Sequence, residues 1–354
     1  MLRRSFLLAA ASTGLASRLQ ARSAPEVQPG ADRLIMDAMG ELRLGYEPAL
    51  IREMLASGMD SITVTLSDPK LEGAAALELA VDDLLAHDRF IAAHPTLLLR
   101  ATSATDVETA RRSGRLAVFY LFQNTVQFGT GLDRVDLFYR MGLRTCQLTY
   151  NTRNHAGVGC FESGGLAPFG HELIAKLNAS RILMDLSHAN MQTMAEAIAS
   201  SRQPVVVSHT GCMAVHENRR NTTDENLRAL AARGGVVGLC QLRPFLTLKK
   251  QDNLHAYFDH LLHAVKVAGA EHVAIGSDRD HRRIELTPEY VAELKREAGG
   301  RPIEDELPWF IHELNGPRRM EVIWDGLAKR GLTARDVEGV MGTNLLRLYR
   351  DVIG

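Results

Sequence analysis

Nine short apolar runs alternate with amphipathic stretches along most of this chain, and that alternation limits the folds open to it. Several of the stretches end in glycine just before the next run, as at Gly142, Gly234 and Gly269, which is a helix C-terminal signal. Strands that alternate with helices predict a parallel sheet with crossover helices. The expected strands are residues 33–39, 60–66, 96–102, 116–122, 144–150, 181–187, 204–210, 235–241 and 272–278, and the clearest helices are residues 48–58, 75–87, 133–142, 169–178, 224–234 and 257–269.

The number of expected strands favours a closed barrel over an open sheet. Eight or nine strands without a Pro/Gly/Ser-rich linker predict an α/β fold, a (β/α)8 TIM-type barrel that forms a single domain over residues 24–354. The alternative is a doubly wound open sheet, but no G-x-G-x-x-G follows the first strand, so its dinucleotide-binding version loses support. From Glu321 onward the pattern predicts two extra helices packed on the outside of the barrel.

The first residues have the features of an export signal rather than of the fold. Arg3 and Arg4 precede a short apolar run, and small residues near Ser23 offer a cleavage point. Residues 1–23 are therefore expected to be a twin-arginine signal peptide, and the mature protein to be periplasmic or otherwise exported. The alternative is an uncleaved N-terminus. The apolar run is too short to span a bilayer, and the C-terminal residues lack the hydrophobic tail of a lipid-anchor signal, so no membrane span is expected.

Four cysteines in 354 residues do not form a disulfide scaffold. Cys146 and Cys240 lie in apolar runs and are expected to be buried. Cys160 and Cys212 lie in loop-like sequence, where one bridge is possible in an oxidising compartment.

Charge balance excludes one class of partner. The chain has 41 Lys and Arg against 42 Asp and Glu, a formal net charge of −1. Nothing in that balance attracts nucleic acid or an anionic membrane. A homodimer is possible, because the amphipathic segment at residues 137–142 could be either a dimer face or a surface packed on the barrel.

Polar side chains follow almost every expected strand at its C-terminal end, and in a barrel these ends share one mouth. Two strands end in Ser-His, at His188 and His209, and the last ends at Asp278. Imidazole nitrogens with a carboxylate oxygen suit Zn²⁺, and an open coordination position would let the ion activate water. Ser187 and Ser208 are expected to orient the loops. The remaining polar strand ends are Glu41, Gln123, Tyr150 and Asp280.

Arginines near the mouth are candidates for binding a substrate carboxylate. Arg220 has the planar fork suited to that group, although its surroundings also look like a helix start capped by Asn221 or Thr222. Arg282 and Arg283 form a basic cluster that either binds a carboxylate or lies in a solvated loop.

These motifs together resemble the membrane (renal-type) dipeptidase family, peptidase family M19 of the amidohydrolase superfamily. The resemblance rests on residues 147–193, on residues 204–239 and on VAIGSDRD at 273–280, and it reaches GVMGTNLLRLYRD near the C-terminus. It implies a barrel with two zinc ions bridged by a glutamate, which hydrolyses dipeptides with a metal-bound hydroxide. On that resemblance His188 and His209 match the two histidines that bind one of the metal ions. Arg220 matches the arginine that holds the substrate carboxylate, and Asp278 matches the catalytic aspartate.

The other half of the implied site departs from the family. This chain has Met39-Gly40-Glu41 where the family has His-x-Asp. It has Gln123 in place of the bridging glutamate, and Tyr150 in place of the histidine that contacts the substrate in many members. A neutral amide is a poor bridge between two cations because it brings no charge to offset theirs. We therefore expect one zinc ion rather than two.

The leading prediction is a metal-dependent hydrolase of dipeptides or related small amides. The metal would be held by His188 and His209, with Gln123 or Glu41 as a weak oxygen ligand. Asp278 would ligate the ion or act as general base, and Tyr150 would donate a hydrogen bond to the carbonyl or its oxyanion. One alternative is a metal-poor pseudo-enzyme that binds a peptide or peptide-derived metabolite, or serves as a maturation factor. Another keeps the metal for a different reaction on a peptide-like substrate.

Overall fold

The computed structural model describes residues 33–251, 253–298 and 302–354. The expected export signal at residues 1–23 lies outside this part. All nine predicted strands are confirmed, each within or near its predicted range. They are β1 (Ile35–Gly40), β2 (Met59–Leu66), β3 (Leu98–Arg100), β4 (Leu116–Phe122), β5 (Leu143–Gln147), β6 (Leu183–Asp185), β7 (Val206–Thr210), β8 (Val236–Leu239) and β9 (Val273–Ile275).

Helices connect consecutive strands, as the alternation predicts. Those between the strands are α1 (Pro48–Ala56), α2 (Gly73–Ala93), α3 (Ala104–Arg112), α4 (Asp133–Arg140), α5 (Pro168–Ala179), α6 (Met191–Ser200), α7 (Asp224–Ala232), α8 (Arg243–Leu246), α9 (Asn253–Ala268) and the 3₁₀ turn η1 (Ala270–His272). Those after β9 are α10 (Pro288–Glu297), the 3₁₀ turns η2 (Glu304–Glu306) and η3 (His312–Leu314), α11 (Arg319–Lys329), α12 (Ala334–Glu338), the π-helical turn η4 (Gly339–Thr343) and α13 (Asn344–Val352).

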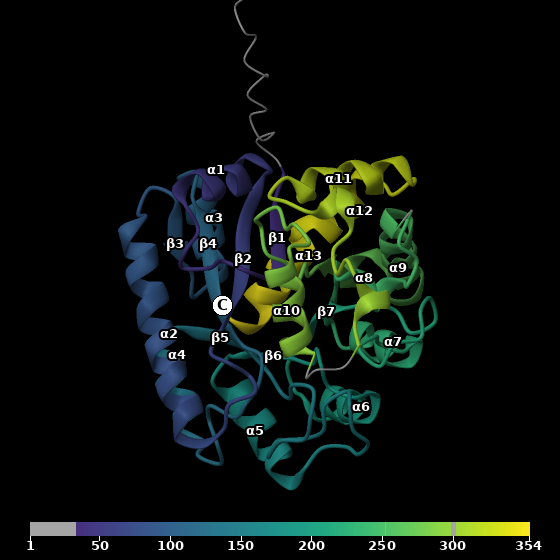
Figure 1. Ribbon diagram of the computed structural model, residues 1–354. Helices are drawn as coiled ribbons and strands as arrows, with labels where there is room; N and C mark the ends of the chain where they lie inside the picture. Colours follow the sequence, from purple (N-terminus) through teal and green to yellow (C-terminus); the bar gives the residue numbers. More distant parts are fainter. Residues whose placement is uncertain (1–32, 252, 299–301) are drawn as a thin grey trace, which may run out of the picture.

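The sheet closes on itself through eight parallel strands, which confirms the (β/α)8 barrel (Figure 1). Strand β2 pairs with β4 over six residues, so β3 is not part of the closed ring. Instead β3 pairs with the first half of β4, at 116–118, and β5 pairs with the second half, at 120–122. Strand β3 is thus an edge strand outside the ring, and it shares one side of β4 with β5.

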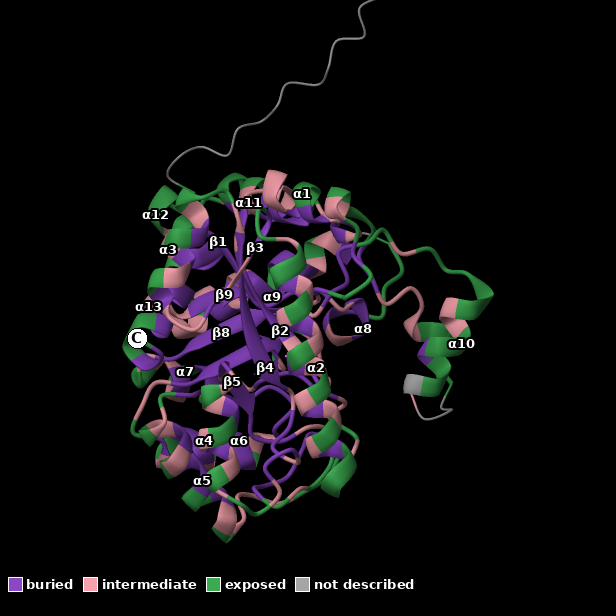
Figure 2. Ribbon diagram, turned by 90° about the vertical axis from the view of Figure 1, so that its left-hand side faces the viewer, coloured by how far each residue is buried: buried purple, intermediate pink, exposed green. Residues whose placement is uncertain are grey.

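Two apolar cores lie on the two faces of the barrel wall. Along β4, Leu116, Val118 and Tyr120 belong to the core between strands and outer helices, whereas Ala117 and Phe119 belong to the core inside the barrel. This alternation follows from the period of two in a β-strand. The continuous apolar runs in the sequence arise because both faces are covered, and Figure 2 shows most of the strand residues buried.

The last helix lies elsewhere than predicted. Helix α13 is strongly amphipathic, and its apolar face packs against inward-pointing strand residues such as Met36 and Phe119. Tyr349 stacks edge-on against Phe119, with ring centroids 4.8 Å apart, and its hydroxyl lies 2.5 Å from Thr63 Oγ1 on β2. The prediction that the C-terminal helices pack on the outside is therefore wrong for α13. Its apolar face packs against the core inside the barrel, while Arg350 and Asp351 on its other face are exposed.

The segment between β9 and α11 leaves the barrel and returns beside its mouth. Helix α10 stands away from the body of the protein in Figure 2. The chain returns through Phe310, which pairs with Leu242 after β8. The buried Arg243 fastens this return by donating hydrogen bonds to four carbonyls, those of Thr247, Lys249, Asp305 and Pro308.

The predictions about disulfide bonds and about membrane spans can be compared with the fold. Cys146, Cys160, Cys212 and Cys240 are all buried free thiols, so the possible bridge between Cys160 and Cys212 is absent from the described residues. No helix in the described ranges is both long and apolar enough to cross a membrane.

Candidate active site

The predicted site residues meet at the C-terminal ends of the strands. A cavity of about 1480 Å³ opens there, and Glu41, Gln123, Tyr150, His188, Arg220 and Asp278 all line it. His209 is completely buried, and its Nε2 atom lies 3.0 Å from Nε2 of His188. The structure therefore brings the seven residues to one mouth, as the strand-end positions of all of them except Arg220 predict.

The remaining nitrogen of each histidine is held by a polar group. His209 Nδ1 lies 2.8 Å from Ser208 Oγ, which donates to Asp185 Oδ2 at 2.5 Å. A hydroxyl that gives its only proton to a carboxylate must accept from the imidazole, so His209 carries its proton on Nδ1. His188 Nδ1 lies 2.6 Å from Asn151 Oδ1, an acceptor, which places the His188 proton on Nδ1 as well.

These hydrogen bonds leave two lone pairs facing each other. With both protons on Nδ1, the two Nε2 atoms at 3.0 Å are both acceptors, an arrangement that is repulsive unless a cation lies between them. Burial lowers the pKa of His188 and of His209 well below the usual range, and the charge of Arg220 adds to both shifts. Holding the outer ring nitrogen in this way is typical of metal-binding histidines.

Asp185 is the centre of this arrangement and was not predicted. It is fully buried, and its Oδ1 accepts hydrogen bonds from the backbone N–H groups of Ser187 and Ser208. Ser187 Oγ accepts in turn from the N–H of His209. In the sequence Asp185 sits inside an apolar strand run, and nothing there marks it as the residue that joins two Ser-His strand ends. The orienting role predicted for the two serines agrees with these contacts.

Backbone conformation and close packing fix where the strand-end side chains lie. His188 and Asp278 both have left-handed backbone, with φ of 67° and 52°. This conformation is uncommon outside glycine. Gly238 and Gly276 lie beside the Ser208 carbonyl, and a Cβ on Gly276 would come within 1.6 Å of that oxygen. The strands carrying His209 and Asp278 therefore approach closely only because these positions lack side chains.

Charged groups surround the histidine pair. Burial raises the pKa of the Asp278 carboxyl to about 7, and the positive charge of Arg220 opposes that shift. Arg220 lies over the ring of Phe245 at 5.3 Å and donates to the His209 carbonyl at 3.3 Å. Tyr150 stacks on His188, with ring centroids 4.3 Å apart. The mouth thus holds a cation, a carboxyl and a phenol beside the two imidazoles.

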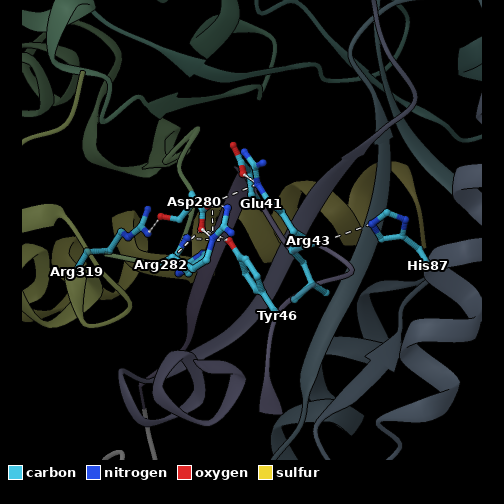
Figure 3. Close-up of polar contacts among 9 residues, drawn as sticks. Glu41, Arg43, Tyr46, His87, Asp280, Arg282 and Arg319 are labelled. Carbon is cyan, nitrogen blue, oxygen red and sulfur yellow. Dashed lines mark hydrogen bonds and ion pairs between the residues drawn. The ribbon is translucent and has the colours of Figure 1, made fainter. Parts of the chain in front are cut away.

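The two predicted oxygen ligands have other partners. Glu41 Oε2 lies 2.5 Å from Arg43 Nε, and Arg43 also reaches Asp280 at 3.2 Å, as Figure 3 shows. Gln123 donates from Nε2 to Thr65 Oγ1 at 2.7 Å. Asp280 itself is held by Tyr46, Arg43 and Arg282 (Figure 3). Burial raises its pKa, but the hydrogen bonds from Arg282 and Tyr46 outweigh that effect and hold the value at about 2.

In the part of the chain that the structure describes, no group of three or more His, Cys, Asp and Glu side chains is arranged to hold a metal. The 3.0 Å between the two Nε2 atoms is somewhat shorter than the roughly 3.4 Å that separates two nitrogen ligands of one tetrahedral zinc ion, so the two imidazoles would have to move slightly apart to share an ion. The Gln123 amide, which also lines the mouth, is a neutral oxygen donor.

Comparison with known proteins identifies the family. The model of the membrane dipeptidase family (peptidase family M19) matches residues 35–294, which is most of the described chain. The chain belongs to this family. An amidohydrolase from Pseudomonas aeruginosa of known structure superposes with a TM-score of 0.80 at 28% sequence identity, over 92% of this chain and 98% of its own.

Two curated relatives have a similar degree of identity. An uncharacterized dipeptidase of Schizosaccharomyces pombe is 29% identical over 248 residues, which is 68% of this chain and 54% of the relative. The dipeptidase verJ of Clonostachys rogersoniana is 29% identical over 256 residues, 71% of this chain and 59% of the relative. The chain thus spans little more than half the length of these two proteins.

Proposed function

We propose that this protein is a metal-dependent hydrolase of dipeptides or related small amides, with one zinc ion held between His188 and His209. The observation that carries the proposal is the pair of Nε2 atoms at 3.0 Å, each with its other ring nitrogen held by a hydrogen bond. Membership of the membrane dipeptidase family supports the reaction class. The fourth coordination position would be left for water, with the Gln123 amide as a further neutral donor.

The remaining residues of the mouth supply binding and proton transfer. A bound zinc ion contributes Lewis acidity at the scissile carbonyl and at the attacking water. Arg220 holds the substrate carboxylate through its planar fork. Asp278 accepts a proton from the attacking water, and Tyr150 donates a hydrogen bond to the carbonyl oxygen as negative charge develops there.

Metal content per chain tests the proposal directly. Elemental mass spectrometry after zinc supplementation should find about one ion per chain, because the structure offers two nitrogen ligands for a single position. His188→Ala should lose that ion, whereas the exposed His171→Ala is the matched control and should keep it. Zinc-loaded protein should hydrolyse members of a dipeptide panel.

Other outcomes would change the conclusion. Two ions per chain would refute the single-ion site and show that Glu41 and Gln123 replace the missing ligands. No bound ion, together with no hydrolysis, would refute the hydrolase and leave a binding protein or maturation factor built on the same barrel.

We also propose that the protein acts in the periplasm or otherwise outside the cytoplasm, on the strength of the paired arginines Arg3 and Arg4 before a short apolar run. Replacing both arginines with lysine should leave the protein in the cytoplasmic fraction. Equal export of both forms would contradict a twin-arginine signal. A homodimer stays a prediction, and light scattering on the purified chain would test it.

A further inference from the structure

Two buried guanidinium groups line the same cavity. Arg220 is 6% exposed and Arg279 is 4% exposed, and both face the mouth of the barrel. Each lies over an aromatic ring, Arg220 over Phe245 at 5.3 Å and Arg279 over Phe310 at 5.9 Å. Stacking on a ring holds a guanidinium in place and leaves its edge N–H groups free to donate.

Neither guanidinium has a carboxylate partner within 4.0 Å among the described residues. Nε of Arg220 and Nη2 of Arg279 are buried without any hydrogen-bond partner in that part of the chain. The buried Arg243 is different, because it donates to four backbone carbonyls. Buried polar groups are normally satisfied, so the two unsatisfied atoms beside a cavity indicate that a ligand supplies their acceptors.

Asp278 is the buried carboxyl on which both Arg220 and Arg279 act. Asp280 already has Arg43 and Arg282, and Glu41 is paired with Arg43. One carboxyl therefore faces two guanidiniums, and leaving a buried charge uncompensated is costly.

We propose that the substrate carries two carboxylates and that Arg279 is the residue that selects the second one. Arg220 binds the α-carboxylate, and Arg279 binds a side-chain carboxylate, so the substrate class is dipeptides that contain Asp or Glu. This inference rests on the proposed function for the role of Arg220. Arg279 directly follows Asp278 in the chain, which places the second anionic group beside the reacting centre.

Binding to metal-stripped protein separates this inference from the proposed hydrolysis. After EDTA treatment, calorimetry would compare Ala-Glu with Ala-Gln, and Glu-Ala with Gln-Ala, which differ only by a carboxylate in place of an amide. At least one acidic peptide should bind about tenfold or more tightly than its amide partner, the effect of a hydrogen bond between charged groups. With zinc restored, kcat/KM should show the same preference.

Variants assign the preference to one side chain. Arg279→Met should bring the acidic and amide peptides to equal affinity, and Arg279→Lys should keep part of the preference through its charge. The matched control is Arg219→Met, an exposed arginine on the same cavity, which should keep the full preference.

Three results would overturn the inference. They are equal affinity of the wild-type protein for both members of each pair, an unchanged preference in Arg279→Met, and an equal loss of preference in Arg219→Met. The first of these needs no variant, so a folding defect would not leave the inference untested. Acidic preference without hydrolysis would refute the proposed function alone, and hydrolysis without acidic preference would refute the inference alone.

Discussion

Asp60 offers a quantitative test of the electrostatics of this barrel, at a position far in sequence from the candidate active site. Its side chain is 14% exposed at the start of β2, and Oδ2 accepts from the Ile35 N–H at 2.9 Å. Arg111 Nε lies 3.9 Å from Oδ1. Burial raises the pKa of this carboxyl from 3.8 to about 6, more than the Ile35 and Arg111 interactions lower it.

The sign and size of the effect on stability follow from that shift. Because the folded state binds the proton more tightly, the free energy of unfolding falls as the pH rises from about 4 through 6. Above that range the ionised Asp60 costs about 3 kcal/mol, at about 1.4 kcal/mol for each pH unit between 3.8 and about 6. Asp60→Asn keeps an acceptor for the Ile35 N–H and removes the charge.

We therefore expect Asp60→Asn to stabilise the protein at pH 8 by as much as about 3 kcal/mol, and by little at pH 4. Urea denaturation at pH 4, 6 and 8, followed by circular dichroism, measures the difference. The matched control is Asp136→Asn, whose exposed carboxylate is paired with Lys176 at 2.6 Å. That pairing lowers the pKa of Asp136, so this control should lose stability at pH 8 rather than gain it.

One result would refute the reasoning. If Asp60→Asn is no more stable than the wild type at pH 8, the ion pair with Arg111 and the Ile35 hydrogen bond outweigh the cost of burial.

Three further substitutions test the packing, the proposed chemistry and a helix end. Gly276→Ala should lower the free energy of unfolding by about 3 kcal/mol or more, because its Cβ would come within 1.6 Å of the Ser208 carbonyl oxygen. An unchanged midpoint of urea denaturation would contradict this packing. Tyr150→Phe should lower kcat of the zinc-loaded protein about 100-fold and change KM little, and an unaltered kcat in steady-state assays would remove Tyr150 from the mechanism. Thr223→Ala should cost about 1 kcal/mol, because Thr223 accepts from the Asn226 N–H at the start of α7. Urea denaturation measures the loss, and an unchanged midpoint would show that Thr223 does not stabilise this helix end.

The sequence predicted the barrel well because both faces of its wall are apolar. Runs such as residues 116–122 are buried on both sides, so they are recognisable without any knowledge of their neighbours. The edge position of β3 could not be predicted in the same way, because it depends on β4 pairing with two strands along one side. The amphipathic pattern of α13 indicates that one of its faces is buried, but it does not indicate which surface of the barrel that face packs against.

The candidate site was predictable where residue type and strand end coincide. His188, His209 and Asp278 meet both conditions, and the structure places all three at the mouth. Asp185, Asn151 and Arg279 were missed for physical reasons. Asp185 lies within a strand run, and Asn151 contacts His188, which is 37 positions away in the chain. Arg279 is notable because its Nη2 atom has no hydrogen-bond partner among the residues that the structure describes, and only the fold reveals that.

Helix α13 also has a consequence for how the chain folds. The hydrogen bond between Thr63 and Tyr349 joins residues 286 positions apart, and the inward-facing residues of β1 need α13 to cover them. A growing chain therefore makes its first strands long before it makes the helix that completes the inner core. Contacts of such long range slow folding and leave apolar surface open to aggregation. We expect folding to finish only after residues 344–352 are made.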